Sequence, residues 1–97
     1  MAFNNNTNKC NLTGYVVGEI KSISTYAIEF SLRVQRKGKP GENTFADTFT
    51  IYVSNKETVE FCKTHFRANL PIQCKGEIRN WADKSVKICC DEIIIKS

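Results

Sequence analysis

Hydrophobic and polar residues alternate with a period of two along most of the chain. In the segment 26–36 the apolar residues Ile28, Phe30, Leu32 and Val34 share one face, and mainly charged or polar residues occupy the other. Successive side chains of a β-strand point to opposite faces, so this pattern predicts a strand with one buried face. The same alternation predicts four more strands, at about residues 10–20, 46–54, 72–79 and 86–95.

One stretch, about residues 56–66, breaks the alternation and has apolar residues at helical spacing. Ser54 or Asn55 directly precedes it and is a candidate N-cap, because both side chains accept hydrogen bonds from the free amides of a first helical turn. Asn69 and Pro71 follow and end the helix. The sequence therefore predicts one short helix between the third and fourth strands.

The predicted order of elements, β-β-β-α-β-β, indicates an all-β domain with one short helix. Long, curved strands with a single helix after the third fit a five-stranded Greek-key barrel, the OB-fold, with the helix at one end. A ferredoxin-like fold would need a second helix, for which the sequence has no periodicity. We expect one OB-fold domain at residues 9–97, preceded by a loose, asparagine-rich arm at residues 1–8.

Composition and charge exclude several classes of protein. The 97 residues are 41% hydrophobic, which is too apolar for a disordered chain. No apolar run reaches the roughly 18 residues of a membrane span, and the first residues do not resemble a secretory leader, so we expect a cytoplasmic protein without membrane contact. The net charge of +4 permits a polyanionic partner but does not require one.

The cysteines and the single histidine give no pattern for metal binding or catalysis. An odd number of cysteines that includes an adjacent pair argues against a disulfide framework, and His65, three residues after Cys62, has no second ligand pair. No phosphate-binding glycine loop or nucleophile elbow occurs either. We expect no metal, no cofactor and no enzymatic activity, with reduced and buried thiols at Cys10, Cys62, Cys74, Cys89 and Cys90.

Four stretches of the chain resemble the motifs of a known family. Residues 8–14 read NKCNLTG, residues 30–36 read FSLRVQR and residues 76–81 read GEIRNW. The fourth stretch begins at Ala46-Asp47 and continues, after an apolar alternation, to Lys56-Glu57. In this order and spacing they are similar to the bacterial and phage single-stranded DNA-binding proteins, over about residues 8–94.

This resemblance implies an OB-fold that binds single-stranded DNA without sequence preference and assembles as a homodimer or homotetramer. It implies the coating of exposed strands in DNA replication, recombination or the DNA metabolism of a phage or mobile element. The family's acidic tail, which recruits replication proteins, has no counterpart before the chain stops at Ser97, so we expect no recruitment through such a tail. Its absence fits a phage or mobile-element protein.

Two other functions stay open from the sequence. The first is a replisome or primosome adaptor that keeps the fold and acts mainly through protein contacts. The second is RNA binding by the same surface, because base stacking does not distinguish the two sugars unless a 2′-hydroxyl is also contacted.

Binding of single strands needs cations along a groove that follows the backbone. Charged residues gather at the end of the second strand and in the turn after it, where Arg36 matches the family's arginine. Two more cations flank the only tryptophan. The predicted cation set is Arg33, Arg36, Lys37, Lys39, Arg79 and Lys84.

Aromatic faces for the bases are the second requirement. Trp81 lies in a polar turn where no apolar alternation places it in the core, so we expect an exposed or half-exposed indole. In the third strand one alignment puts Phe49 at the family's stacking position, whereas strand parity turns Phe49 toward the core and Tyr52 outward. We keep both and favour Tyr52, with Tyr15 as a further candidate.

Overall fold

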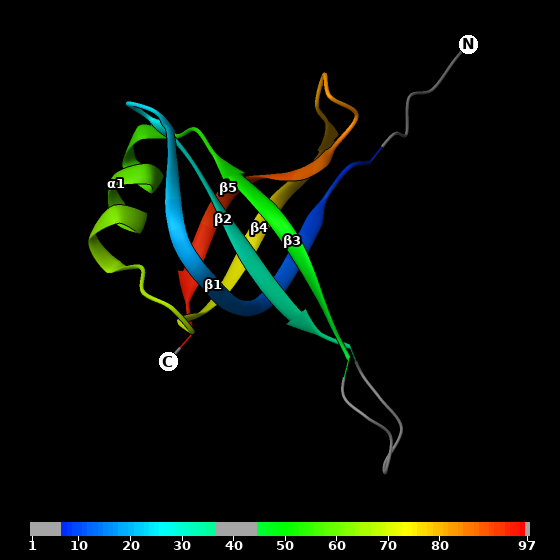
Figure 1. Cartoon of the computed structure of the whole chain (residues 1–97), viewed down its shortest axis with the longest axis horizontal. Helices are drawn as coiled ribbons and strands as arrows, with labels where there is room; N and C mark the ends of the chain where they lie inside the picture. Colours follow the sequence, from blue (N-terminus) through cyan, green and yellow to red (C-terminus); the bar gives the residue numbers. More distant parts are fainter. Residues whose placement is uncertain (1–6, 37–44, 97) are drawn as a thin grey trace.

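The computed structural model describes residues 7–36 and 45–96, in which five strands form a closed barrel. The elements are β1 (Cys10–Ser24), β2 (Ala27–Gln35), β3 (Ala46–Val53), α1 (Lys56–His65), β4 (Pro71–Asn80) and β5 (Val86–Ile95) (Figure 1). Around the barrel the strands follow the order β1-β2-β3-β5-β4. The predicted all-β OB-fold, with one helix between the third and fourth strands, is confirmed.

Four antiparallel seams and one parallel seam close the barrel. The first part of β1 pairs with β4 and its second part with β2, so this strand bends from one half of the barrel into the other. The parallel seam joins β3 to β5 through the pairs Ile51–Ile88 and Tyr52–Cys89. The fold therefore brings the third strand beside the last one, although the helix and β4 separate them in the chain.

β1 is longer than the alternation predicts, because it continues beyond an irregularity at Gly18. The register with β2 shifts between Val17 and Lys21, and Gly18 has a φ of +74°, a left-handed conformation that glycine adopts without strain. Past this irregularity the strand pairs again with β2 as far as Ser24. The strand therefore ends at Ser24, and the predicted end near residue 20 is wrong.

Two other glycines allow strands to approach each other closely. A Cβ on Gly14 would overlap the carbonyl oxygen of Arg33, and one on Gly76 would overlap that of Cys89. The register between β4 and β5 is irregular next to Gly76. A side chain at either position would push apart two strands of the barrel, so both sites require glycine.

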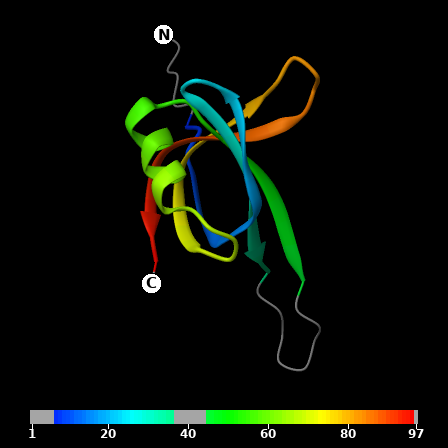
Figure 2. The same cartoon turned by 60° about the vertical axis from the view of Figure 1, so that its left-hand side comes forward.

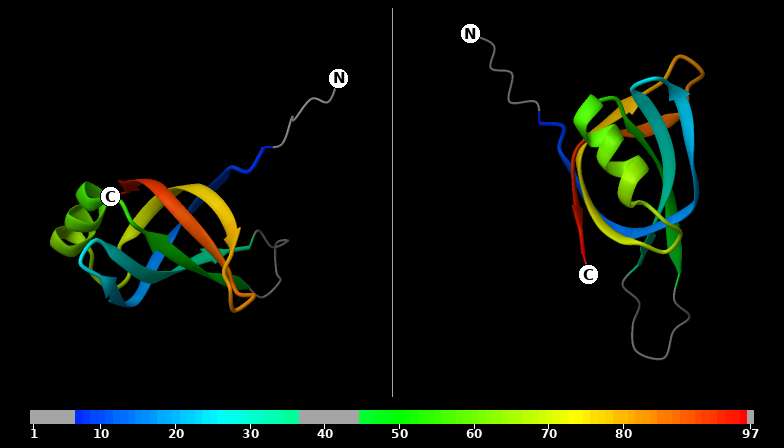
Figure 3. Two further views of the ribbon diagram at one scale, coloured as in Figure 1. Left: turned by 90° about the horizontal axis from the view of Figure 1, so that it is seen from above. Right: turned by 90° about the vertical axis from the view of Figure 1, so that its left-hand side faces the viewer.

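The inward faces of the strands and one side of α1 form a single core. Val59 and Cys62 of the helix are fully buried, and the Phe66 ring meets Phe30 edge-on with centroids 5.0 Å apart and planes at 87°. α1 covers one end of the barrel, and the β4–β5 hairpin projects away from it (Figures 2 and 3). The core residues are Val16, Ile28, Phe30, Leu32, Ile51, Val53, Val59, Cys62, Leu70, Ile72, Cys74, Ile88 and Cys90.

The helix begins where its capping residue predicts. The Asn55 side chain accepts a hydrogen bond from the Thr58 amide at 3.1 Å, which identifies Asn55 as the N-cap. Phe66 is the C-cap, so the helix ends one residue earlier than predicted. α1 has ten residues. No helix among the described residues is long and apolar enough to cross a bilayer.

Three of the five cysteines are small hydrophobic residues of the core, as the sequence predicts, whereas Cys10 and Cys89 are only partly buried and the prediction is wrong for these two. Cys62, Cys74 and Cys90 are buried members of the core. Burial raises the pKa of the Cys62 thiol to about 12, with a smaller contribution from nearby Cys90. A neutral thiol at this position is therefore the stable form at ordinary pH.

Asn8, which the sequence analysis assigned to a loose arm, is hydrogen-bonded to β4. The Asn8 side chain donates a hydrogen bond to the Ile78 carbonyl oxygen at 2.7 Å and accepts one from the Ile78 amide at 2.9 Å. These two bonds occupy the backbone of β4 where the ladder with β1 would continue. Asn8 is thus attached to the barrel.

Candidate nucleic-acid interface

An aromatic pair forms the centre of the candidate interface. Trp81 follows β4 in the hairpin turn, and Tyr52 lies on the outward face of β3. Their ring centroids are 5.1 Å apart and their planes are inclined at 67°. Both side chains are half-buried, which confirms the half-exposed indole predicted for Trp81.

Local hydrogen bonds fix the turn that carries the indole. The Trp81 amide donates to the Ser85 carbonyl oxygen at 2.8 Å, and the Lys84 amide donates to the Trp81 carbonyl oxygen at 2.9 Å. The side chain and then the backbone amide of Ser85 donate to Asp83 and lower the pKa of that carboxyl group. Lys84 has a φ of +68°, as expected for the last residue of a three-residue hairpin loop.

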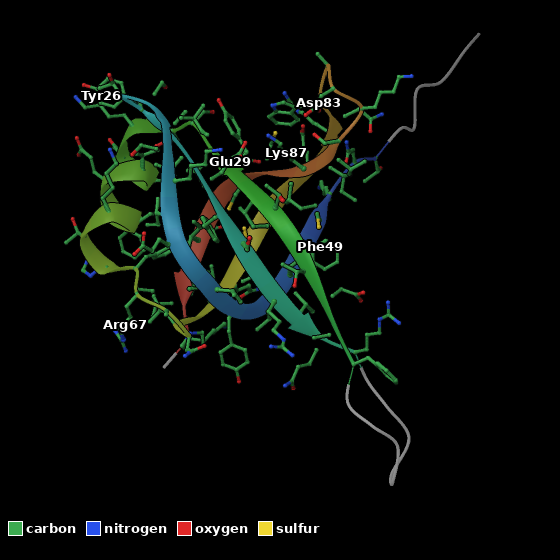
Figure 4. All side chains as sticks on the ribbon, viewed as in Figure 1. Tyr26, Glu29, Phe49, Arg67, Asp83 and Lys87 are labelled. Atoms are coloured by element: carbon green, nitrogen blue, oxygen red, sulfur yellow. The ribbon has the colours of Figure 1, made fainter. Side chains whose placement is uncertain are left out.

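Lys87 is a functional candidate that the sequence analysis missed. Its ammonium nitrogen lies 4.9 Å from the centroid of the Trp81 ring, a cation–π contact, and also bonds to the Glu29 carboxylate. In Figure 4 the Glu29 and Lys87 side chains lie next to one another below the hairpin that carries Asp83. The alternation in the sequence could have identified it, because Lys87 precedes Ile88, whose side chain is buried, so the Lys87 side chain points outward.

The structure places the two aromatic candidates of β3 on opposite faces of the strand. Phe49 packs against the core, whereas Tyr52 is on the opposite face beside Trp81. The parity prediction is confirmed, since Phe49 faces the core and Tyr52 faces outward. We therefore remove Phe49 from the candidate interface.

The predicted cations differ in how far they are already neutralised. Arg36 forms two hydrogen bonds with the Asp47 carboxylate, at 2.6 and 2.8 Å, and these bonds lower the pKa of Asp47. Arg79 donates two hydrogen bonds to a single oxygen of the Glu77 carboxylate, at 2.8 and 3.2 Å. The salt bridges among the described residues do not include Arg33 or Lys84, and both are exposed.

Arg33 projects from the face of β2 that also carries Glu29, and it pairs in register with Tyr15 of β1 and Thr48 of β3. Tyr15, the further aromatic candidate, is 46% exposed. The predicted cations Lys37 and Lys39 lie outside the described residues. The outward faces of β2 and β3 therefore connect Arg33 at one end with the aromatic pair at the other.

Phe45 is a second residue that the sequence analysis missed. Its side chain is 62% exposed directly before β3, and its carbonyl oxygen accepts a 2.7 Å hydrogen bond from the Arg36 amide. A large apolar side chain left in water beside cations is a candidate stacking surface. The signal in the sequence was its position at the edge of the basic turn, outside the alternation.

Other features of the described residues give no competing site. They contain no cluster of three or more His, Cys, Asp or Glu side chains that could hold a metal. A groove of about 680 Å³ lies along the start of β1 and the β4–β5 pair, away from Trp81. Its lining has no aromatic residue, and its two lysines are outnumbered by three carboxylates, so it is unsuited to a polyanionic strand.

Comparison with solved structures identifies proteins of the same fold. The chain superimposes on a Plasmodium falciparum single-stranded DNA-binding protein in complex with single-stranded DNA, with a TM-score of 0.78, 18% identity and coverage of 99% and 100% of the two chains. For a small single-stranded DNA-binding protein of Streptomyces coelicolor the TM-score is 0.75, the identity is 15%, and the superposition covers 94% of each chain.

A third similar structure is the dimeric N-terminal domain of PriB from Thermoanaerobacter tencongensis, with a TM-score of 0.71, 20% identity and coverage of 93% and 97%. No protein-family profile and no curated protein matches the sequence. At these identities the likeness establishes the fold, which is the OB-fold found in single-stranded DNA-binding proteins.

Proposed function

We propose that this chain is a non-enzymatic protein that binds single-stranded DNA without sequence preference. The observation that carries the proposal is the half-exposed Trp81 beside Tyr52, at the edge of a barrel face that also presents Arg33. Stacking of bases on aromatic rings and attraction of phosphates by cations are the two requirements of such binding. OB-folds bind oligonucleotides on the surface of strands 2 and 3 and the loop between strands 4 and 5, where these residues lie.

The residues divide into two roles. Trp81 and Tyr52 would stack on bases, with exposed Phe45 as a further surface. Arg33 and Lys84 would contact phosphates directly, and Lys37 and Lys39 of the β2–β3 turn belong to the same proposal. Arg36 and Arg79 are held by carboxylates in the free protein, so their contribution to binding would be smaller.

The biological role we propose is the coating of exposed strands in the cytoplasm, during replication, recombination or the DNA metabolism of a phage or mobile element. The likeness to a single-stranded DNA-binding protein solved with its ligand supports this choice.

The proposal is tested by titrating the protein with oligo-dT at two salt concentrations, beside duplex DNA of the same length. We expect saturable binding to oligo-dT that quenches Trp81 fluorescence and weakens as salt rises, with weaker binding to the duplex. Equal affinity for oligo-U would extend the function to RNA. No binding to oligo-dT, together with a protein that copurifies with the chain, would favour the adaptor function instead.

We also propose that the chain assembles as a dimer or tetramer. β1 exposes Tyr15 and Val17 on its outward face, to 46% and 39%, and large apolar side chains on a sheet surface favour association. The likeness to a dimeric PriB domain supports this proposal. Light scattering should give a mass above the 11.0 kDa of one chain, and Val17→Glu should lower it. A wild-type mass that stays at 11.0 kDa on concentration would contradict the assembly.

A further inference from the structure

The salt bridge between Glu29 and Lys87 is withdrawn from water, unlike the other pairs of the described residues. The Glu29 and Lys87 side chains are 16% and 17% exposed, whereas the side chains of the other three pairs are 39% or more exposed. Solvent and salt screen charges less in such surroundings, so the Coulombic attraction between the two groups is stronger than between exposed charges at the same distance. The pair also lies inside the candidate interface, because Lys87 contacts the Trp81 ring.

A carboxylate in this position is unfavourable for a protein that binds a polyanion. Glu29 lies opposite Tyr52 in the register of β2 and β3, at the aromatic end of the face assigned to the ligand. Its negative charge repels an approaching phosphate and at the same time neutralises the nearest cation. The arrangement needs an explanation beyond stability, since a salt bridge that is largely buried contributes little net stabilisation.

A carboxylate and a phosphate offer an ammonium group the same kind of partner, an anionic oxygen that accepts charge-assisted hydrogen bonds. Lysine carries a compact charge on a flexible stem, so the Lys87 ammonium group can change its partner while it stays close to the indole. A base stacked on the Trp81 ring would bring its own backbone phosphate close to this ammonium group.

We propose that Lys87 is a phosphate-binding residue whose charge Glu29 holds in the free protein, and that a phosphate of the bound strand replaces the Glu29 carboxylate. Glu29 thereby acts as an internal competitor that lowers the affinity for single strands. The inference rests on the proposed function and adds a phosphate contact and a residue that limits affinity.

This exchange has a distinct dependence on salt. In the wild type the new Lys87–phosphate contact releases a counterion, while the freed Glu29 carboxylate takes one up, so the two effects nearly cancel. With glutamine at position 29 only the release remains. We expect Glu29→Gln to steepen the slope of log K against log salt by about 0.7, so that its advantage over wild type grows about fivefold per tenfold dilution of salt.

Four variants, titrated with oligo-dT over a range of salt, test the exchange. Glu60→Gln makes the same change of net charge on α1 and should leave the slope unchanged. Glu29→Gln/Lys87→Gln should return to the wild-type slope, whereas Glu29→Gln/Lys63→Gln, with the same net charge, should keep the steep one. A Glu29→Gln slope equal to that of wild type, or a steep slope that survives loss of Lys87, would overturn the proposal.

A measurement on the wild-type protein covers the case in which a variant at position 29 does not fold. The ¹⁵N resonance of the Lys87 ammonium should shift when saturating oligo-dT is added, because its partner changes. An unchanged resonance would overturn the exchange but leave the proposed function intact. If the wild type does not bind oligo-dT at all, the proposed function itself has failed.

Discussion

The Trp81 ring meets the Tyr52 ring edge-on, with 5.1 Å between the centroids and 67° between the planes. One ring belongs to the β4–β5 hairpin and the other to β3, so the contact ties the hairpin to the barrel surface. Aromatic pairs of this kind contribute about 0.5–1.5 kcal/mol beyond the apolar area that they bury. The pair therefore has a structural part as well as the proposed binding part, and experiments must separate the two.

Trp81→Ala should weaken binding to oligo-dT by about 1–3 kcal/mol, the range for the loss of one stacked base. Trp81→Phe keeps an aromatic face and should lose less. Both affinities are measured by anisotropy of a labelled oligonucleotide, since the variants lack the intrinsic fluorophore, after circular dichroism has shown that they are folded. A folded Trp81→Ala protein with wild-type affinity would show that the indole is structural only.

Tyr52 and Phe49 should respond in opposite ways to truncation, because they lie on opposite faces of β3. We expect Tyr52→Ala to reduce affinity for oligo-dT with a modest loss of stability. Phe49→Ala removes a ring packed against the core and should lower the free energy of unfolding by about 2 kcal/mol, with little change in the affinity of the folded fraction. Urea denaturation and titration of both variants provide the comparison; the reverse result would return Phe49 to the interface.

Arginines that contact phosphates should leave a salt-dependent effect that an aromatic residue does not. Arg33→Gln should weaken binding to all sequences alike and flatten the slope of log K against log salt by about 0.7. Arg36→Gln should flatten it less, because Asp47 already neutralises Arg36. Lys63→Gln on α1 is the control with the same loss of charge, and an equal effect of this control would place the phosphate path elsewhere.

Lys84 occupies a left-handed backbone conformation, with a φ of +68°, that costs a residue with a side chain roughly 1–2 kcal/mol. Lys84→Gly and Lys84→Ala remove the same charge, but only glycine relieves this cost. We expect the glycine variant to be about 1 kcal/mol more stable than the alanine variant in thermal and urea unfolding. Equal stabilities would mean that the turn relaxes without a positive φ at this position.

Cys62 should make the barrel less stable at alkaline pH. Its pKa is raised by burial from 9.0 to about 12 in the folded protein, so the unfolded chain loses this proton first as the pH rises. The stabilisation is complete below pH 9 and is lost between about pH 9 and 12. We expect Cys62 to lower the free energy of unfolding by about 1 kcal/mol between pH 7 and pH 10. Urea unfolding at the two pH values should show that the free energy of unfolding of Cys62→Ala falls by about this amount less than that of wild type.

The alternation of apolar residues was sufficient to predict the fold and the orientation of β3. Parity alone placed Phe49 inward and Tyr52 outward, and the side-chain chemistry of Asn55 marked the start of the helix. These features depend on residues near one another in the chain, where periodicity and capping are direct signals.

The rest of the interface depends on registers that local patterns do not contain. Glu29 and Lys87 are 58 positions apart and meet only because β3 and β5 pair in parallel and place β2 and β5 on either side of β3. The contact of Lys87 with Trp81 further requires the turn in which Lys84 has a positive φ. The neutralisation of Arg36 by Asp47 likewise depends on the β2–β3 register. The sequence analysis therefore counted Arg36 as a free cation, although a carboxylate binds it.

The parallel seam between β3 and β5 joins two residue pairs, fewer than any other seam of the barrel. Thermal breathing of the barrel should therefore begin along this line, since it can part while the four antiparallel ladders stay intact. Tyr52 lies on β3 and Trp81 lies in the hairpin that leads into β5, so a nucleic-acid strand stacked on both rings would bridge the two sides of the seam. Amides of β3 and β5 beside the seam should then exchange with deuterium more slowly in the complex, because the bound ligand would hold together the two strands that share the fewest residue pairs.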